Sequence, residues 1–269
     1  VMSATPIPRT LALMLYGDLQ VSVLDELPPG RKRVETYAVP PSYRPRLDAF
    51  IQKQVQEGGQ VYIVCPLIET EEGEDERQSA VAYAKALQQR VPQVSIGLMH
   101  GKLKSREKEQ VMEDFVQGKI QVLVSTTVIE VGVNVPRASL MIVEDADRFG
   151  LSQLHQLRGR VGRGELQSYC VLVSASKSAK TQERLRVMTQ CHDGFRIAEA
   201  DLKLRGPGDF FGDRQHGLPE FKIADLSQDV SLLQNAQQAA QQVLRQDPDL
   251  SSHPLLLEKV KQLFHRAQQ

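Results

Sequence analysis

Residues 121–144 read QVLVSTTVIEVGVNVPRASLMIVE, and this stretch holds two short β-branched runs, 121–125 and 140–144, separated by a segment with threonines and a glycine. Apolar runs of this length predict buried strands. Four further runs of this kind lie on either side of the stretch, at 34–39, 61–65, 94–98 and 169–173. Amphipathic stretches fill the gaps. Strands that alternate with helices predict an α/β fold, in which helices flank a parallel sheet.

The clearest helical signal occupies residues 105–117. Ser105 stands at the expected cap position, and Val111, Met112 and Phe115 share one face. Gly118 follows the last residue. A capping residue before an amphipathic run and a glycine after it are typical of helix boundaries.

Outside the strand region the pattern changes. Residues 6–20 predict a helix and 21–24 a strand, which together indicate the tail of another domain. After residue 173 the chain predicts a helical hairpin and then a long Gly- and Pro-rich loop, and such loops are commonly functional. The two helices of the hairpin are expected at 177–192 and 195–204, and the loop at 205–219. Two further helices are expected in the tail, one from 227 onward and one at 255–264.

The composition is that of a globular protein. Of the 269 residues, 41% are hydrophobic and 25% charged, which suffices for a core. No apolar stretch approaches the roughly 20 residues of a membrane helix. The chain opens on Val1 and runs into a Pro-bearing turn without a signal peptide, so we expect further sequence upstream. Three distant cysteines, Cys65, Cys170 and Cys191, predict buried or inert thiols in a reducing compartment, and no metal site is expected.

The net charge is zero, but the charges are segregated. Arg148, Arg158, Arg160 and Arg163 fall within sixteen positions, while acidic residues gather at 69–76. A clustered positive charge is compatible with a nucleic-acid partner even when the total is neutral.

The segment Gln156-Leu-Arg-Gly-Arg-Val-Gly-Arg163 is the most specific signal. We expect its glycines to permit a close backbone approach, with Arg160 and Arg163 one turn apart on a helix start. Two guanidinium groups that converge on one point favour a polyphosphate. The alternative is a basic surface helix, which the glycines would weaken.

The segment Ser125-Thr-Thr-Val-Ile-Glu-Val-Gly-Val-Asn-Val-Pro136 follows a predicted strand. Ligands bind beyond the carboxyl ends of parallel strands, so its threonine hydroxyls and backbone N–H groups could hold a phosphate. An ordinary capped strand end is the alternative.

These two segments resemble motifs V and VI of superfamily 2 helicases. His100-Gly101 resembles the DNA-facing motif between IV and V, and Ser3-Ala4-Thr5-Pro6 resembles motif III of the first motor domain. Residues 25–31 and 201–215 resemble the RecG family of branch-migrating DNA translocases. The resemblance covers nearly the whole chain except the tail from Ser227.

The resemblance assigns roles residue by residue. It implies that Arg160 and Arg163 act as arginine fingers on the γ-phosphate, positioned by Gln156. Asn134 stands where helicases of this group usually have Asp, which puts the strength of its coupling to the nucleotide in doubt. The nucleotide-facing residues implied are Glu130, Gly132 and Asn134, and the DNA-facing ones are His100, Gly101, Thr126 and Thr127.

The hairpin and loop resemble the translocation motif that this family shares with the transcription-repair coupling motor Mfd. In that interpretation Arg184 on the hairpin and Gln215 in the loop transmit domain closure to the duplex. The full set of coupling residues implied is Ser3, Thr5, Arg184, Arg205 and Gln215. The sequence alone would favour a solvated surface charge for Arg184.

The chain lacks both G-x-x-x-x-G-K-[ST] and an Asp-Glu-x-His box. We therefore expect the phosphate cradle and the Mg²⁺ site upstream, and no ATP hydrolysis by the chain alone. The implied organisation is the tail of a first RecA-like domain (1–33), a second RecA-like motor domain (34–176), the translocation motif (177–220) and a helical segment (221–269).

The implied function is remodelling of stalled forks and Holliday junctions by an ATP-dependent DNA helicase in repair and recombination. ATP and Mg²⁺ are the implied cofactors, and branched double-stranded DNA the implied partner, with single-strand DNA-binding protein as a second candidate. A monomer without a membrane partner is expected, in the bacterial cytoplasm or in a plastid or mitochondrion of a plant. The alternatives are an Mfd-like motor, a non-catalytic nucleic-acid-binding module and, least favoured, a phosphate-binding metabolic enzyme.

Overall fold

The computed structural model describes residues 32–66, 76–126, 134–205 and 230–267. These residues fall into two compact units, one that extends to Ile197 and one that begins at Ala198. The predicted helix at 6–20, the strand at 21–24 and nearly all of the loop at 205–219 lie outside the described residues.

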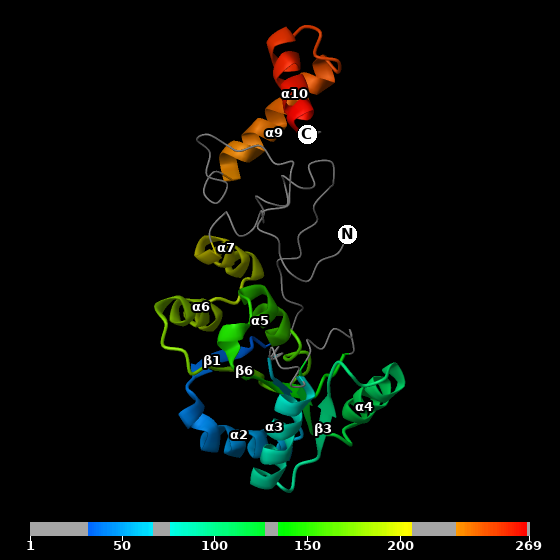
Figure 1. The fold of residues 1–269 in the computed structure, drawn as a ribbon, viewed down its shortest axis with the longest axis vertical. Coiled ribbons are helices and arrows are strands. Elements are labelled where there is room, and N and C mark those ends of the chain that lie inside the picture. The colour runs from blue at the N-terminus through cyan, green and yellow to red at the C-terminus, as the bar shows by residue number, and fades with distance from the viewer. Residues whose placement is uncertain (1–31, 67–75, 127–133, 206–229, 268–269) are drawn as a thin grey trace. The chain divides into compact units, whose positions relative to one another are not determined.

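A six-stranded parallel sheet forms the centre of the first unit (Figure 1). All six predicted strands are confirmed, with ends displaced by at most a few residues. Their order is β1-β6-β5-β2-β4-β3, so the chain crosses the sheet several times between neighbouring strands. The strands are β1 (Glu35–Val39), β2 (Gln60–Val64), β3 (Ile96–Met99), β4 (Val122–Ser125), β5 (Ala138–Val143) and β6 (Tyr169–Val173).

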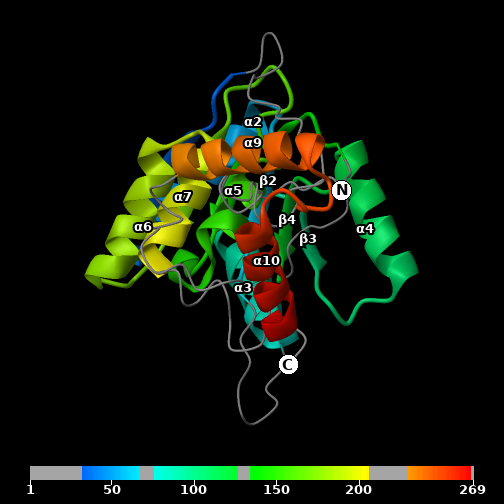
Figure 2. The ribbon, with the colours of Figure 1, turned by 90° about the horizontal axis from the view of Figure 1, so that it is seen from above.

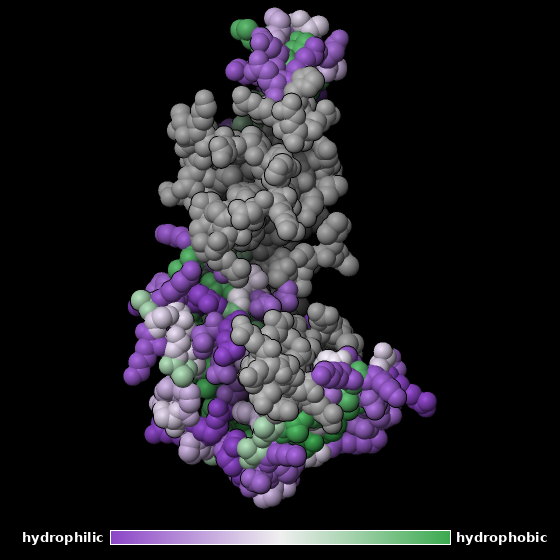
Figure 3. Space-filling view, in the orientation of Figure 1, coloured by the Kyte–Doolittle hydropathy of each residue, from purple (hydrophilic) through white to green (hydrophobic). Residues whose placement is uncertain are grey.

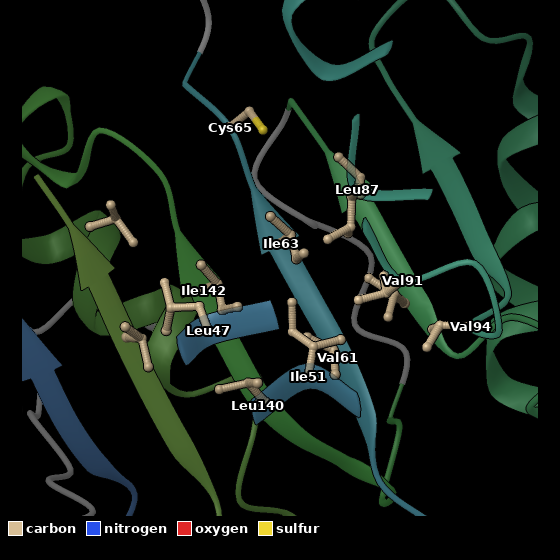
Figure 4. Close-up of a cluster of buried hydrophobic side chains, with 14 of the residues drawn as sticks. Leu47, Ile51, Val61, Ile63, Cys65, Leu87, Val91, Val94, Leu140 and Ile142 are labelled. Atoms are coloured by element: carbon tan, nitrogen blue, oxygen red, sulfur yellow. The ribbon is translucent and has the colours of Figure 1, made fainter. Parts of the chain in front are cut away.

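Helices cover both faces of this sheet. The helices α2 (Arg44–Gln56) and α3 (Glu76–Arg90) contribute Leu47, Ile51 and Leu87 to a buried cluster with alternate residues of β2 and β5 (Figure 4). On β2 the intervening Tyr62 points to the other face, where its ring lies 4.8 Å from that of Phe115 in α4 (Ser105–Gln117). The predicted α/β architecture is thus confirmed.

Two more helices lie on the opposite side of the sheet from α2 and α3. They are α5 (Leu151–Arg158) and α6 (Ala179–Gln190). Figures 1 and 2 both show α6 and α4 at opposite ends of the sheet, and most of the described surface in Figure 3 is hydrophilic.

The helix α4 has the predicted bounds but not the predicted cap. Lys104 is the N-cap and Ser105 is the first helical residue. The backbone N–H of Lys104 donates to the Glu107 carboxylate at 2.8 Å, which satisfies the helix start without a hydroxyl. At the other end Gly118 has φ 83°, and this left-handed conformation terminates the helix.

The predicted hairpin consists of α6 and α7 (Gly194–Arg205). The second unit holds two further helices, α9 (Val230–Gln246) and α10 (Pro254–Ala267). Before α10 the Asp247 carboxylate accepts hydrogen bonds from His253, Ser252 and Ser251, and these bonds, that of His253 most of all, lower the pKa of Asp247. None of the described helices is long and apolar enough to cross a membrane.

The cysteines are free thiols. Cys65 and Cys170 are buried, and burial raises the pKa of each to about 12, so both are protonated at neutral pH. Cys191 is partly exposed in the turn between α6 and α7. The prediction of buried thiols is confirmed for the first two.

Candidate functional site

The two predicted finger arginines follow a helix instead of starting one. The helix α5 ends at Arg158, and residues 159–164 form a loop, called here the arginine loop. Gly162 has φ 75°, a left-handed conformation that a continuing α-helix excludes. The prediction that Arg160 and Arg163 lie on a helix start is therefore wrong.

Both arginines belong to the arginine loop, three residues apart. Burial raises the pKa of Tyr62 to about 12, and the positive charges of Arg160 and Arg163 both oppose this rise. Arg163 is exposed, and its Nε donates to the Gly159 carbonyl at 3.3 Å, one of the carbonyls that the helix end leaves without an intrahelical partner. Arg160 is half-buried. The loop thus presents two cations together.

The arginine loop lies at the amino ends of the strands, called here the amino edge. A Cβ on Gly162 would contact Val34, just before β1, and a Cβ on Gly164 would overlap the carbonyl oxygen of Pro136, just before β5. The side chain of Gln167 donates to the Arg33 carbonyl at 3.0 Å. The closest backbone approach is therefore at Gly164, and not at Gly159 or Gly162, the glycines of the predicted segment.

The end of the motif V segment meets the arginine loop at this edge. Pro136 contacts Gly164, and the exposed Asn134 lies two residues earlier in the chain. Gln156 is half-buried on α5. Three other predicted residues of this segment, Thr127, Glu130 and Gly132, lie outside the described residues.

The predicted DNA-facing residues lie at the opposite, carboxyl edge of the sheet. His100 follows β3 and Thr126 follows β4, and the Thr126 N–H donates to the Met99 carbonyl at 3.2 Å. His100 and Thr126 are 6% and 2% exposed, and in the described part of the chain neither His100 Nδ1 nor Thr126 Oγ1 has a hydrogen-bond partner. Buried polar atoms without a partner are costly, which points to a polar ligand. Gly101 is exposed beside them.

A polar cluster at the carboxyl edge was not predicted. The two terminal guanidinium nitrogens of Arg44, Nη1 and Nη2, donate to the buried carboxylate of Glu144, which follows β5. The Tyr83 hydroxyl donates to the same carboxylate at 2.8 Å. Hydrogen bonding to Glu144 raises the pKa of Arg44, and burial raises that of Tyr83. These contacts tie α2 and α3 to the segment that leads into α5. Only tertiary contact between distant residues reveals them.

Arg158 is not part of the exposed basic cluster. It is 4% exposed, and burial lowers its pKa. Its Nη1 donates to the carbonyls of Met188 at 2.9 Å and Cys191 at 2.8 Å, and its Nη2 contacts His155 Nδ1 at 3.0 Å. The clustering of this arginine with its neighbours in sequence was therefore misleading, because its charge points inward.

Arg184 of α6 holds the other end of α5. Its guanidinium donates to the carbonyl of Asp147, at 3.3 Å, and to that of Phe149. The carboxylate of Asp147 also accepts from the Ser174 hydroxyl at 2.5 Å. Arg184 is therefore not the solvated surface charge that the sequence alone favours. Among the other predicted coupling residues, Ser3, Thr5 and Gln215 lie outside the described residues, and Arg205 ends α7 with its side chain undescribed.

The contact between His155 and Arg158 requires a neutral imidazole, because Nδ1 accepts the hydrogen bond. Burial and the Arg158 charge lower the pKa of His155 from 6.5 to about 4. As the pH falls, His155 therefore takes up a proton at a higher pH in the unfolded chain than in the folded chain. We expect full stability above pH 6.5 and a falling melting temperature as the pH drops from 6.5 toward 4.

Melting measured across this pH range in wild type and in His155→Gln checks the expectation. Glutamine keeps an acceptor for Arg158 but does not titrate, so the variant should lose less stability with acid. A residual slope is expected from His192, whose pKa burial also lowers. If the melting temperature falls equally steeply with acid in both proteins, the loss of stability comes from groups other than His155.

Replacing Gly164 by alanine should destabilise the first unit, because the new methyl group would overlap the Pro136 carbonyl. Overpacking of this kind typically costs about 1–3 kcal/mol. Gly159→Ala in the same loop is the matched control, since its Cβ would lie 3.3 Å from the nearest atom, the Gln156 carbonyl oxygen. Urea denaturation measures both variants. A smaller loss for Gly164→Ala than for Gly159→Ala would contradict the close approach.

The six-stranded parallel sheet with helices on both faces is that of the C-terminal RecA-like domain of a helicase. The family model for the helicase conserved C-terminal domain matches residues 44–165. The model for ATP-dependent DNA helicase RecG, domain 3, C-terminal, matches residues 191–267. These matches, with the RecG relatives described below, show that the chain corresponds to the C-terminal helicase and domain 3 region of the RecG family.

Individual relatives agree with this placement. The ATP-dependent DNA helicase RecG of Bacillus subtilis is 53% identical over 246 residues, which are 91% of this chain and 36% of that protein. RecG of Thermotoga maritima is 51% identical over 243 residues, 90% of this chain and 31% of that protein. The chain thus spans about a third of the length of these relatives.

A solved structure has the same fold. It is the structure of RecG bound to a three-way DNA junction, with a TM-score of 0.70 and 52% sequence identity. The match covers 87% of this chain and 30% of that one. The Mfd-like alternative is not supported, since the domain 3 model that matches is that of RecG.

Proposed function

We propose that the chain forms the second motor domain and the coupling helices of an ATP-driven translocase that remodels branched duplex DNA, such as stalled forks and Holliday junctions. The observation that carries the proposal is the separation of two candidate ligand surfaces. The arginine loop meets Pro136 at the amino edge of the sheet, and His100 and Thr126 lie buried at the carboxyl edge. The RecG relative solved with a three-way DNA junction supports branched DNA as the partner.

The amino edge fits a nucleotide triphosphate. Arg160 and Arg163 supply two permanent cations in the loop whose Gly164 contacts Pro136, and the amide of the exposed Asn134, two residues before Pro136, suits a ribose hydroxyl. ATP supplies the anhydride bond whose cleavage drives the motor. The arginines would stabilise the charge that builds up on the γ-phosphate, while Gln156 orients them.

In residues 32–66, 76–126, 134–205 and 230–267, no group of three His, Cys, Asp or Glu side chains could hold a metal ion. We assign Mg²⁺ and the phosphate cradle to a first motor domain that acts together with this one, because the chain lacks G-x-x-x-x-G-K-[ST]. The chain contributes the arginines from across the cleft.

The carboxyl edge fits a DNA backbone. The unpaired Thr126 hydroxyl can donate to a phosphate oxygen, and His100 Nδ1 can do so when it carries a proton. The segment 127–133 connects this edge to Asn134 at the nucleotide edge. A contact with DNA is thereby linked through one short stretch of chain to the residues that face ATP.

The test is ATPase activity of the full-length protein with and without forked DNA. We expect forked DNA to stimulate turnover, and the 269-residue chain alone to show none because it lacks G-x-x-x-x-G-K-[ST]. A full-length protein that binds forks without any DNA-stimulated turnover would favour the non-catalytic module. Turnover by the isolated chain above background would refute the division of labour.

A further inference from the structure

Arg158 is a buried charge that the proposed chemistry does not use. Its side chain is 4% exposed, and its acceptors are backbone carbonyls and the neutral ring of His155. Burying a guanidinium costs several kcal/mol unless hydrogen bonds compensate it. A helix that needed only packing at this position would have an apolar residue, so the contacts that Arg158 makes require an explanation.

The carbonyl acceptors of Arg158 all lie at one place, the carboxyl-terminal end of α6. Met188 is in the last turn of that helix, and Cys191 begins the turn that leads to α7. A third carbonyl, that of His192, lies 3.5 Å from Nη2. Carbonyls at a helix end carry partial negative charge, and the planar guanidinium reaches several of them at once. Arg158 thereby fastens the end of α5 to the hairpin turn.

The fastening point adjoins the arginine loop. Arg158 is the last residue of α5, and Arg160 follows two residues later. Arg184 fastens the start of α5 to α6 through the carbonyls of Asp147 and Phe149. The two arginines make reciprocal contacts, one from each helix, so α5 cannot pivot on α6 without breaking hydrogen bonds at one of its ends.

We propose that Arg158 is a positioning residue, which sets the direction of Arg160 and Arg163 by fixing the end of α5 to the hairpin turn. This inference rests on the proposed function, because it takes the arginine loop as the γ-phosphate contact. Arg158 is buried against the end of α6, and the proposal gives it no contact with the nucleotide. It acts through the placement of the loop that follows it.

The test uses Arg158→Met in the full-length protein, at saturating forked DNA. Methionine keeps an unbranched apolar side chain but is shorter than arginine and carries no charge. We expect the melting temperature to fall moderately, because the carbonyls of Met188 and Cys191 lose their donor, and the KM for ATP to change little. The kcat should fall about 10²-fold, the size of effect that a misplacement of about 1 Å produces.

Two comparisons separate positioning from other roles. Arg186→Met is the matched control on the exposed face of α6 and should behave like wild type. The triple variant Arg158→Met/Arg160→Ala/Arg163→Ala should have a kcat no lower than that of Arg160→Ala/Arg163→Ala, because a loop without either finger has nothing left to position. Additive losses in the triple variant would overturn the proposal.

The remaining outcomes also decide the matter. If Arg158→Met does not fold, Arg158→Lys keeps the charge but loses the planar fork, and the same non-additive loss of kcat is expected from it. An unchanged kcat in a folded Arg158 variant, with a strong loss in Arg163→Ala, would overturn the positioning role and leave the proposed function intact. An unchanged kcat in Arg163→Ala would instead refute the finger assignment.

Discussion

Replacing Arg163 by alanine in the full-length protein is expected to lower kcat about 10³-fold or more, the loss typical of a missing arginine finger. Arg163 is exposed in the arginine loop, and its described hydrogen bond is to the carbonyl of Gly159. Its removal should therefore leave the fold intact. ATP binding should weaken less than turnover, because the guanidinium acts mainly on charge that develops in the transition state.

Steady-state kinetics and equilibrium ATP binding on the same preparation check this expectation. Arg148→Ala serves as a control, since that arginine lies before α5 at the other end of the helix. A kcat equal to that of wild type in Arg163→Ala would refute the role. A loss confined to ATP binding would indicate a contact with the ground state instead.

Replacing Arg184 by alanine is expected to abolish fork unwinding while DNA-stimulated ATPase stays largely intact. Arg184 contacts the carbonyls of Asp147 and Phe149, at the start of α5. The arginine loop follows the opposite end of that helix. Removing the Arg184 side chain should therefore leave the activation free energy of ATP hydrolysis unchanged. What weakens is the attachment of the hairpin to the motor domain. Gln215→Ala is expected to have the same effect.

ATPase, unwinding and melting measured together distinguish three roles for Arg184. Coupling predicts that only unwinding is lost. A surface charge predicts that all three are unchanged, and a purely structural role predicts that both activities fall with the melting temperature. Parallel loss of both activities in a normally melting variant would contradict coupling.

The strands and the hairpin were predictable because their signals are local. Each strand is a short apolar run, and the bounds of α4 follow from the spacing of Met112 and Phe115 and from Gly118. Capping was less predictable, since Lys104 rather than Ser105 occupies the cap position. A side-chain carboxylate and a hydroxyl both satisfy a helix start, and sequence alone does not choose between them.

The location of the candidate site was less predictable than its residues. Arg158, Arg160 and Arg163 look alike in the sequence, yet Arg158 is buried and Arg163 is exposed. The difference depends on carbonyls at the end of α6, about thirty residues further along the chain. No local pattern encodes that contact, which forms only when α5 and α6 pack against each other.

The sequence by itself determined the six strands, their parallel sheet, the hairpin and the chemical types available in each motif. The tertiary structure decided which edge of the sheet each motif reaches and which arginine turns inward. The physical reason is that hydrophobic periodicity is a property of neighbouring residues, whereas burial of a charge depends on distant groups that can solvate it. For this chain the inward turn of Arg158 and the contact of Gly164 with Pro136 are of the second kind.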